Sequence, residues 1–154
     1  MSELTFSDSV LITRTREDLY DMISDVARMG EFSPVCRECW WDEGVEPVVG
    51  AWFTGRNETP ERTWETRSQV VAADHGVEFA FIVGGTWIRW GYRFADVAGG
   101  TLVTESWDFL PDGLARFAER FGDDAPAQIE DRRRAAHEGI PLTLAAIKRI
   151  AESR

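Results

Sequence analysis

The chain has 154 residues, about the length of one ordinary domain, and can bury roughly two-thirds of its unfolded surface around one core. Its formal net charge of -10 opposes binding to nucleic-acid phosphates and to anionic lipid surfaces. No run of about eighteen apolar residues is present, and the first residues lack the basic region of a secretory signal. We therefore expect a single cytoplasmic domain over residues 1–154, without a nucleic-acid partner and without membrane insertion.

The first part of the chain is predicted to be one strand followed by two helices. Apolar residues alternate over residues 4–12, which indicates a strand. Thr15 is a good N-cap for a helix, and the apolar residues between 19 and 26 have helical spacing. Gly30 ends this helix, which leaves "MGEFSP" as a second short helix before Pro34.

The middle of the chain has the pattern of an antiparallel meander. Apolar residues recur with period two, and the turn sequences "DEG", "VVG", "ETP", "ADHG", "VGG" and "AGG" separate the runs. Short turns favour pairing between consecutive strands. The six predicted strands cover residues 35–42, 50–58, 63–73, 77–83, 86–96 and 101–110.

The last part of the chain is predicted to be helical. "PDGLARFAERFGDDAP" indicates a short helix with its own loop. From Ala125 to the end an apolar stripe that includes Ile140 and Leu144 indicates one long helix. Gly139 and Pro141 are expected to kink it.

Four segments together cover most of the chain: "MGEFSPVCRECWW", "VVGAWFTGRNE", "WETRSQVVAADHGVEFAF" and "WIRWGYRFADVAGGTLVTESWDF". These segments resemble the START-like (SRPBCC) superfamily, in particular its bacterial polyketide cyclase/dehydrase and lipid-transport group. The resemblance implies an α+β helix-grip fold, with a curved seven-stranded antiparallel sheet wrapped around a long C-terminal helix and two short helices between strands 1 and 2. It also implies a START-like ligand-binding domain whose cavity, between sheet and helix, holds a small hydrophobic or aromatic molecule.

The strand alternation supplies walls for such a cavity. Seven Trp, nine Phe and two Tyr make 12% of the chain aromatic, and many of these rings fall on the inner face together with a few polar groups. The alternative is a solid aromatic core, because small domains usually fill their interiors. The expected ligand-binding residues are Trp41, Phe53, Asn57, Trp64, Thr66, Ser68, Phe81, Trp90, Tyr92, Glu105 and Trp107.

Three functions fit these features. The first is a carrier or sensor of a lipid-like or polyketide-like molecule, which needs no cofactor. The second is a polyketide cyclase or aromatase, in which Tyr92 or Asn57 would donate a hydrogen bond to an enolate and Glu105 would move protons. For Glu105 we favour a structural role, with a hydrogen bond to a neighbouring strand or to an arginine of the last helix.

The third function is an interaction module without a ligand. Alternation places Trp40, Trp52 and Trp87 on the outer face, and an exposed aromatic patch usually marks an interface. This hypothesis predicts a homodimer, and it is compatible with either of the other two functions.

The two cysteines of "CRECWW" are three residues apart on a predicted strand. On a regular strand such residues point to opposite faces, which disfavours a redox pair. We expect Arg37, Cys39 and Trp41 to face the interior or its mouth, and Cys36, Glu38 and Trp40 to face outward.

No metal site is expected. Zinc would need His75 and His137 beside the two thiols, and neither histidine has the spacing of a zinc motif. His75 is predicted to be a solvated turn residue and His137 an exposed residue of the last helix. The arginines at 132–134 are expected to pair with nearby acids on an exposed helical face, although one of them could reach the cavity mouth.

Overall fold

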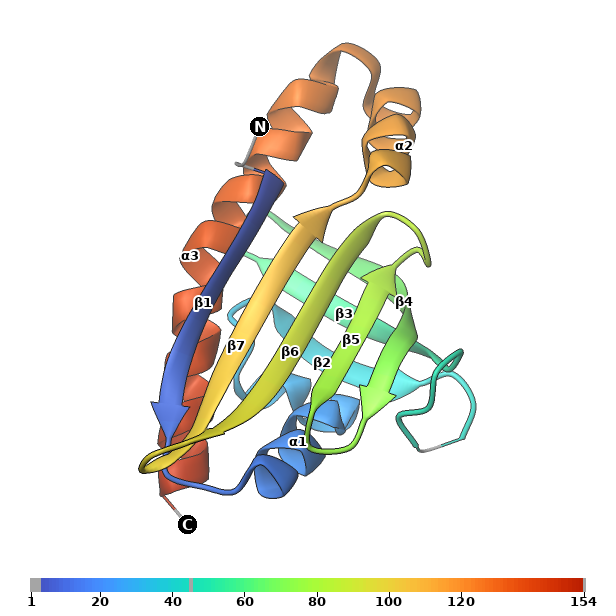
Figure 1. Cartoon of the computed structure of the whole chain (residues 1–154). Helices are drawn as coiled ribbons and strands as arrows, with labels where there is room; N and C mark the ends of the chain where they lie inside the picture. The colour runs from blue at the N-terminus through green and yellow to red at the C-terminus, as the bar shows by residue number, and fades with distance from the viewer. Residues whose placement is uncertain (1–3, 45, 154) are drawn as a thin grey trace.

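The computed structural model describes residues 4–44 and 46–153, and it confirms the predicted helix-grip fold. Within these residues seven antiparallel strands form one sheet in the order β1-β7-β6-β5-β4-β3-β2 (Figure 1). The elements in chain order are β1 (Thr5–Ile12), α1 (Arg16–Ser24), η2 (Val26–Glu31), β2 (Cys36–Trp41), β3 (Trp52–Thr59), β4 (Arg62–Asp74), β5 (Glu78–Val83), β6 (Ile88–Val97), β7 (Gly100–Phe109), α2 (Pro111–Phe121), η3 (Gly122–Asp124) and α3 (Ala125–Glu152). No helix among the described residues is long and apolar enough to cross a membrane.

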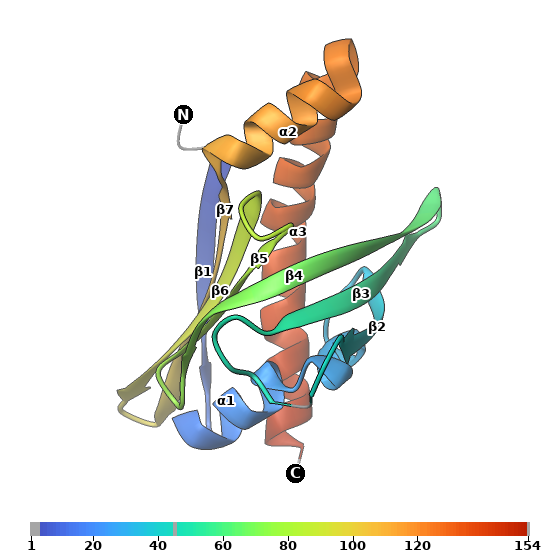
Figure 2. The ribbon, with the colours of Figure 1, turned by 90° about the vertical axis from the view of Figure 1, so that its right-hand side faces the viewer.

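The sheet curves around α3, which packs on its inner face. Figure 2 shows β3 and β4 crossing in front of the helix, whereas β1 and β7 run beside it. The helix contacts β1 and β7, while η2 contacts β2, and α1 contacts β5 and β6. Its buried stripe includes Ile140, Leu144 and Ile147, as the apolar spacing predicts. The inner face of the middle strands is therefore only partly covered by helices.

Two irregularities interrupt the strand pairing. The register between β4 and β5 shifts between Val70 and Ala72, and the register between β2 and β3 shifts between Cys36 and Glu38. A β-bulge bends its strand and increases the local twist. It also adds a residue to one strand, so side chains beyond it point to the face opposite to the one that simple alternation predicts.

The helix α3 continues through the glycine and proline at which we expect a kink. Its helical residues run without interruption through Gly139 and Pro141. Pro141 has no backbone N–H, so the carbonyl of His137 has no partner four residues ahead. The helical stretch from 125 to 152 is therefore kept by packing on β1 and β7 rather than by local preference alone.

Two helical glycines allow a test of how closely α2 packs against the carbonyl group of Trp87. A Cβ atom added to Gly113 in α2 would lie 2.9 Å from the carbonyl carbon of Trp87, and closer still to its oxygen. A Cβ atom added to Gly139 would meet only the Pro34 ring, at 3.6 Å. We expect Gly113→Ala to lower the free energy of unfolding by about 1–3 kcal/mol through overpacking. Gly139→Ala is the matched control and should raise it by up to about 1 kcal/mol. Urea denaturation measures both values, and an unchanged stability of Gly113→Ala would contradict the close α2 contact.

Candidate ligand-binding site

A buried tyrosine and a buried glutamate face each other across two neighbouring strands. Tyr92 of β6 pairs with Glu105 of β7 in the sheet register. The Tyr92 hydroxyl donates a hydrogen bond to Glu105 Oε2 at 3.0 Å. Only 4% of Tyr92 and 3% of Glu105 is exposed, and Glu105 Oε1 is buried without a hydrogen-bond partner in the described structure.

The environment of this pair keeps both groups protonated at neutral pH. Burial raises the pKa of Glu105 to about 8, although the hydrogen bond from Tyr92 opposes this shift. Burial also raises the pKa of Tyr92 well above its ordinary value, and the charge of Glu105 adds to the effect. A protonated Glu105 can accept from Tyr92 on Oε2 and donate a proton from Oε1. The pair therefore presents an unused buried donor.

The sheet register brings the predicted ligand-binding residues onto one continuous inner face. On one side of it Asn57 pairs with Trp64 across β3 and β4, and Asn57 Nδ2 donates to Thr66 Oγ1 at 3.3 Å. On the other side Trp90 of β6 lies between Phe81 of β5 and Trp107 of β7. The prediction from alternation thus selected side chains on one face of six neighbouring strands, β2 to β7.

These residues differ in burial. The buried ones are Phe53, Asn57, Ser68, Phe81, Tyr92, Glu105 and Trp107. The half-buried ones are Trp41, Trp64, Thr66 and Trp90. Aromatic contacts fill part of the interior, since the ring centroids of Phe53 and Phe81 are 5.0 Å apart. The half-buried side chains of β4 and β6 lie where α3 makes little contact with the sheet, and each remains partly exposed.

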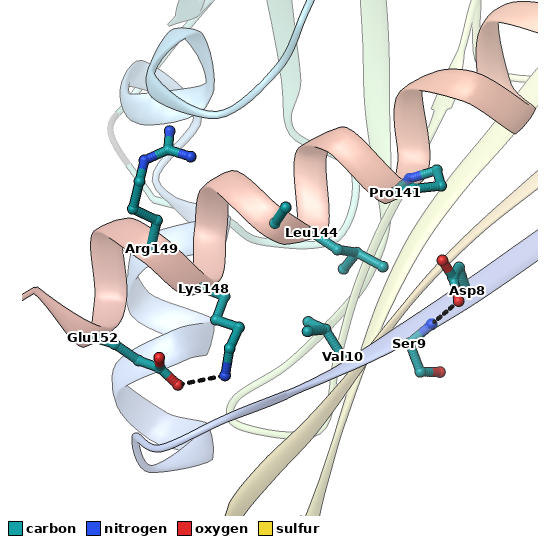
Figure 3. Close-up of a pocket in the computed structure, with 9 residues that line it drawn as sticks. Asp8, Ser9, Val10, Pro141, Leu144, Lys148, Arg149 and Glu152 are labelled. Atoms are coloured by element: carbon teal, nitrogen blue, oxygen red, sulfur yellow. Dashed lines mark hydrogen bonds and ion pairs between the residues drawn. The ribbon is translucent and has the colours of Figure 1, made fainter.

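A separate groove lies between β1 and the second half of α3. It has a volume of about 330 Å³, and none of the predicted ligand-binding residues lines it. Figure 3 shows Val10 opposite Leu144, while Lys148 forms an ion pair with Glu152 at 2.8 Å. Lys148 Nζ also donates to the carbonyl of Leu11 at 2.7 Å. The groove is thus bridged by contacts that fasten α3 to the edge strand.

Three arginines gather at the opposite end of α3. Arg132 lies over the rings of Phe117 and Phe121, with its guanidinium carbon 5.2 Å and 6.0 Å from the two centroids. Arg120 lies 5.1 Å from the same Phe121 ring, and Arg62 lies 3.8 Å from the centroid of the half-buried Trp64.

These charges influence one another. Burial lowers the pKa of Arg132, and the positive charges of Arg62 and Arg120 contribute to the shift. Arg132 pairs with Asp131 at 3.0 Å. In residues 4–44 and 46–153, no carboxylate lies within ion-pair distance of Arg62 or Arg120. The end of the inner face near α2 is therefore locally cationic in an acidic protein.

Comparison with protein families identifies the chain. The family model described as "Polyketide cyclase / dehydrase and lipid transport" matches residues 3–140. The chain belongs to this family. A comparison with curated proteins returned no match.

Solved structures agree with this family membership. The Polyketide_cyc-like protein Cgl2372 from Corynebacterium glutamicum is 51% identical, with 97% of this chain and 91% of that chain covered and a TM-score of 0.71. The di-domain ARO/CYC proteins StfQ, of the steffimycin biosynthetic pathway, and BexL, of the BE-7585A pathway, are 18% and 24% identical, with TM-scores of 0.71 and 0.70. The alignments cover 98% and 99% of this chain but only 51% and 52% of those two, so this family member spans about half their length, and the likeness concerns the fold.

The structure corrects our assignment of the two cysteines. Cys36 and Cys39 are both buried, and their Sγ atoms are 3.1 Å apart, whereas we expected them to point to opposite faces. The cause is the bulge in β2: Cys36 pairs with Asn57, but the next paired residue is Glu38, so Arg37 is the extra residue. Arg37 is exposed, so it does not face the interior itself.

The structure also corrects the prediction for His137. Its ring stacks on Phe6 of β1, with centroids 4.2 Å apart, and Nε2 is buried without a partner in the described part of the chain. Sequence spacing could not show this, because the helix face that meets β1 is decided by docking. His75 is exposed in its turn, as predicted, and its Nε2 lies 2.9 Å from Asp21.

The arginines and the outer tryptophans follow the predictions in part. Arg133 and Arg134 pair with Glu130, whereas the half-buried Arg132 turns toward α2.

Among the tryptophans Trp40 is 37% exposed, while Trp52 and Trp87 are half-buried. An arginine covers each of the three rings, at 4.7–5.6 Å from the centroid. The outer face is therefore less apolar than its sequence indicates.

The raised pKa of Glu105 predicts a specific pH dependence of stability. Between its ordinary pKa and about 8, the folded protein holds a proton that the unfolded chain releases. The free energy of unfolding should therefore fall as pH rises through this window, by up to about 1.4 kcal/mol per pH unit. Glu105→Gln cannot titrate and should remove this loss. Urea denaturation from about pH 5 to about pH 9 compares the two proteins, with the exposed Glu138→Gln as control. Parallel pH profiles for wild type and Glu105→Gln would contradict the raised pKa.

Proposed function

We propose that this protein binds a small hydrophobic or aromatic molecule, lipid-like or polyketide-like, against the inner face of the sheet beside α3. The observation that carries this proposal is Glu105 Oε1, which is buried without a hydrogen-bond partner among the described residues and lies on the same face of the sheet as the half-buried Trp64 and Trp90. An unsatisfied buried polar atom costs about 1–3 kcal/mol. A ligand carbonyl or hydroxyl that reaches Glu105 would recover this cost.

The accessible inner-face rings set the character of the ligand. Trp64 and Trp90 offer flat apolar surfaces, while Thr66 adds a polar group between them. A ligand of about twenty heavy atoms at roughly 0.3 kcal/mol per atom would gain about 6 kcal/mol, which corresponds to a dissociation constant of tens of micromolar. This affinity suits a carrier or sensor of an abundant metabolite.

The arginines near α2 favour a ligand with an anionic end. Arg62 stacks on Trp64, so a molecule that contacts this ring also lies close to a guanidinium. Arg132 is half-buried between aromatic rings, where a charge interacts more strongly than in open solvent. In a chain with net charge -10, this local cluster would orient a carboxylate or phosphate toward the α2 end.

A second function, cyclase or aromatase chemistry, is favoured by one feature of the same pair. A carboxyl group with a pKa of about 8 is close to the working pH, where a general acid or base is most effective. Protonated Glu105 would donate from Oε1 to a ketone oxygen that gains negative charge during aldol closure. Tyr92 would hold Oε2 and thereby orient the carboxyl group.

Glu105→Gln separates binding from catalysis. The amide keeps the shape and a donor, so affinity for a fatty acid or a polycyclic aromatic should stay within a few-fold of wild type in a tryptophan fluorescence titration. If Glu105 only binds the ligand, affinity is the one readout of this variant. If Glu105 moves protons, the rate at which a poly-β-ketone is converted should fall by about 10²-fold in Glu105→Gln. The absence of any saturable fluorescence change across a broad hydrophobic panel would overturn the binding proposal.

Arg132→Gln tests the anionic end of the ligand. We expect the affinity for a long-chain carboxylate to fall by about three- to tenfold, while the affinity for the alcohol of equal length stays unchanged. Arg134→Gln is the matched control, because Arg134 is exposed on the same helix and pairs with acidic neighbours. Equal losses for carboxylate and alcohol would show that Arg132 acts only through packing.

A further inference from the structure

The bulge in β2 creates a pair of facing thiols on the inner side of the sheet. Cys36 and Cys39 are buried, and their Sγ atoms are 3.1 Å apart. A disulfide bond is about 2.05 Å long, so a small side-chain rotation would bring the two atoms to bonding distance. Neither thiol is in a disulfide in this structure.

The thiols lie beside the proposed ligand site. A Cβ atom placed on Gly55 of β3 would be 3.1 Å from Cys39 Sγ, 3.8 Å from Cys36 Sγ and 3.7 Å from Thr66 Oγ1. The absence of a side chain at Gly55 therefore leaves the space that the two sulfurs occupy. The negative charge of a Cys36 thiolate also reaches Tyr92, whose pKa it raises. The dithiol thus adjoins Thr66, and the charge of its thiolate acts on Tyr92.

The two thiols have different acidities. The pKa of Cys36 is lowered, chiefly because the Cys39 thiol donates a hydrogen bond to its sulfur. The pKa of Cys39 is raised for the same reason and by burial. One thiol is thus favoured as the thiolate nucleophile, and the other stays protonated until it is needed. The thioether of Met29 lies 3.8 Å from Cys39 Sγ.

We propose that Cys36 and Cys39 form a redox-active dithiol that a small peroxide converts to an intramolecular disulfide. The Cys36 thiolate attacks one peroxide oxygen, the O–O bond breaks, and the departing hydroxide takes a proton to become water. Cys36 is then a sulfenic acid. Cys39 loses its proton and attacks the Cys36 sulfur, the S–S bond forms, the S–O bond breaks, and a second water leaves. Two thiols are oxidised while one peroxide is reduced.

Burial selects the oxidant. At 4% and 8% exposure both cysteines are buried, so an oxidant that reaches them has to be as small as hydrogen peroxide. Oxidation removes the thiolate charge that acts on Tyr92 and draws the sulfurs together beside Thr66. The effect of these changes on ligand affinity rests on the proposed function, whereas disulfide formation itself does not depend on any ligand.

The first experiment measures the disulfide in the wild-type chain without ligand. The protein is treated with hydrogen peroxide, unfolded in the presence of iodoacetamide, and analysed by intact mass and peptide mapping. We expect the loss of two hydrogens, no alkylation, and a disulfide within the peptide that contains residues 36–39. Two alkylated cysteines after treatment, a disulfide-linked dimer, or sulfinic acids at both positions would overturn the proposal.

Single variants separate the two roles. Cys39→Ser should stop at a Cys36 sulfenic acid that dimedone traps, whereas Cys36→Ser should resist peroxide. Equal dimedone labelling of both variants would overturn the assignment of the nucleophile. Circular dichroism checks that each variant is folded, and the wild-type peptide map decides the proposal if one is not.

Comparing the fluorescence titration of reduced and oxidised wild type then shows the effect on binding. Unchanged affinity would remove the coupling to the ligand site but leave the dithiol established.

Discussion

The inner face of the sheet is wider than the one helix that packs on it, and most of the features of this protein follow from that mismatch. α3 contacts β1 and β7, at one edge of the seven strands. The remaining inner face is covered by α1 and η2, by its own aromatic rings, and by the strands that curve over it. Where these do not reach, Trp64 and Trp90 stay half-buried. The place at which a ligand would contact the sheet is thus the part that secondary structure leaves uncovered.

Polar and charged groups are also unevenly distributed over the inner face. A carboxyl group on β7 faces inward, and the low polarity around it favours the protonated form. Tyr92 satisfies one oxygen of Glu105 and leaves the other unpaired. Such a group weakens the folded state at alkaline pH, yet it offers a hydrogen-bond donor in an apolar setting. The cationic end near Arg132 complements it, so the inner face has a neutral polar centre and a positively charged end.

The β2 bulge shows how one added residue changes the chemistry of a strand. Without it Cys36 would lie on the outer face and the thiols could not meet. With it Arg37 becomes the exposed residue, and two sulfurs share the space above Gly55. The same kind of irregularity in β4 accompanies the bend that carries β3 and β2 around the helix (Figure 2). The bend of the sheet and the dithiol are therefore each accompanied by a β-bulge, the first in β4 and the second in β2.

The sequence alone determined the order of the elements, because period-two runs and glycine turns are local signals that survive into the folded state. It also placed Glu105 and Tyr92 on the inner face, since alternation holds along the regular strands β6 and β7. Tertiary structure decided what depends on pairing or docking. The register of β2 against β3 moved Cys36 inward, the docking of α3 on β1 stacked the half-buried His137 on Phe6, and the packing of α2 left Arg132 half-buried. No local pattern encodes these contacts, because each joins residues that are distant in the chain.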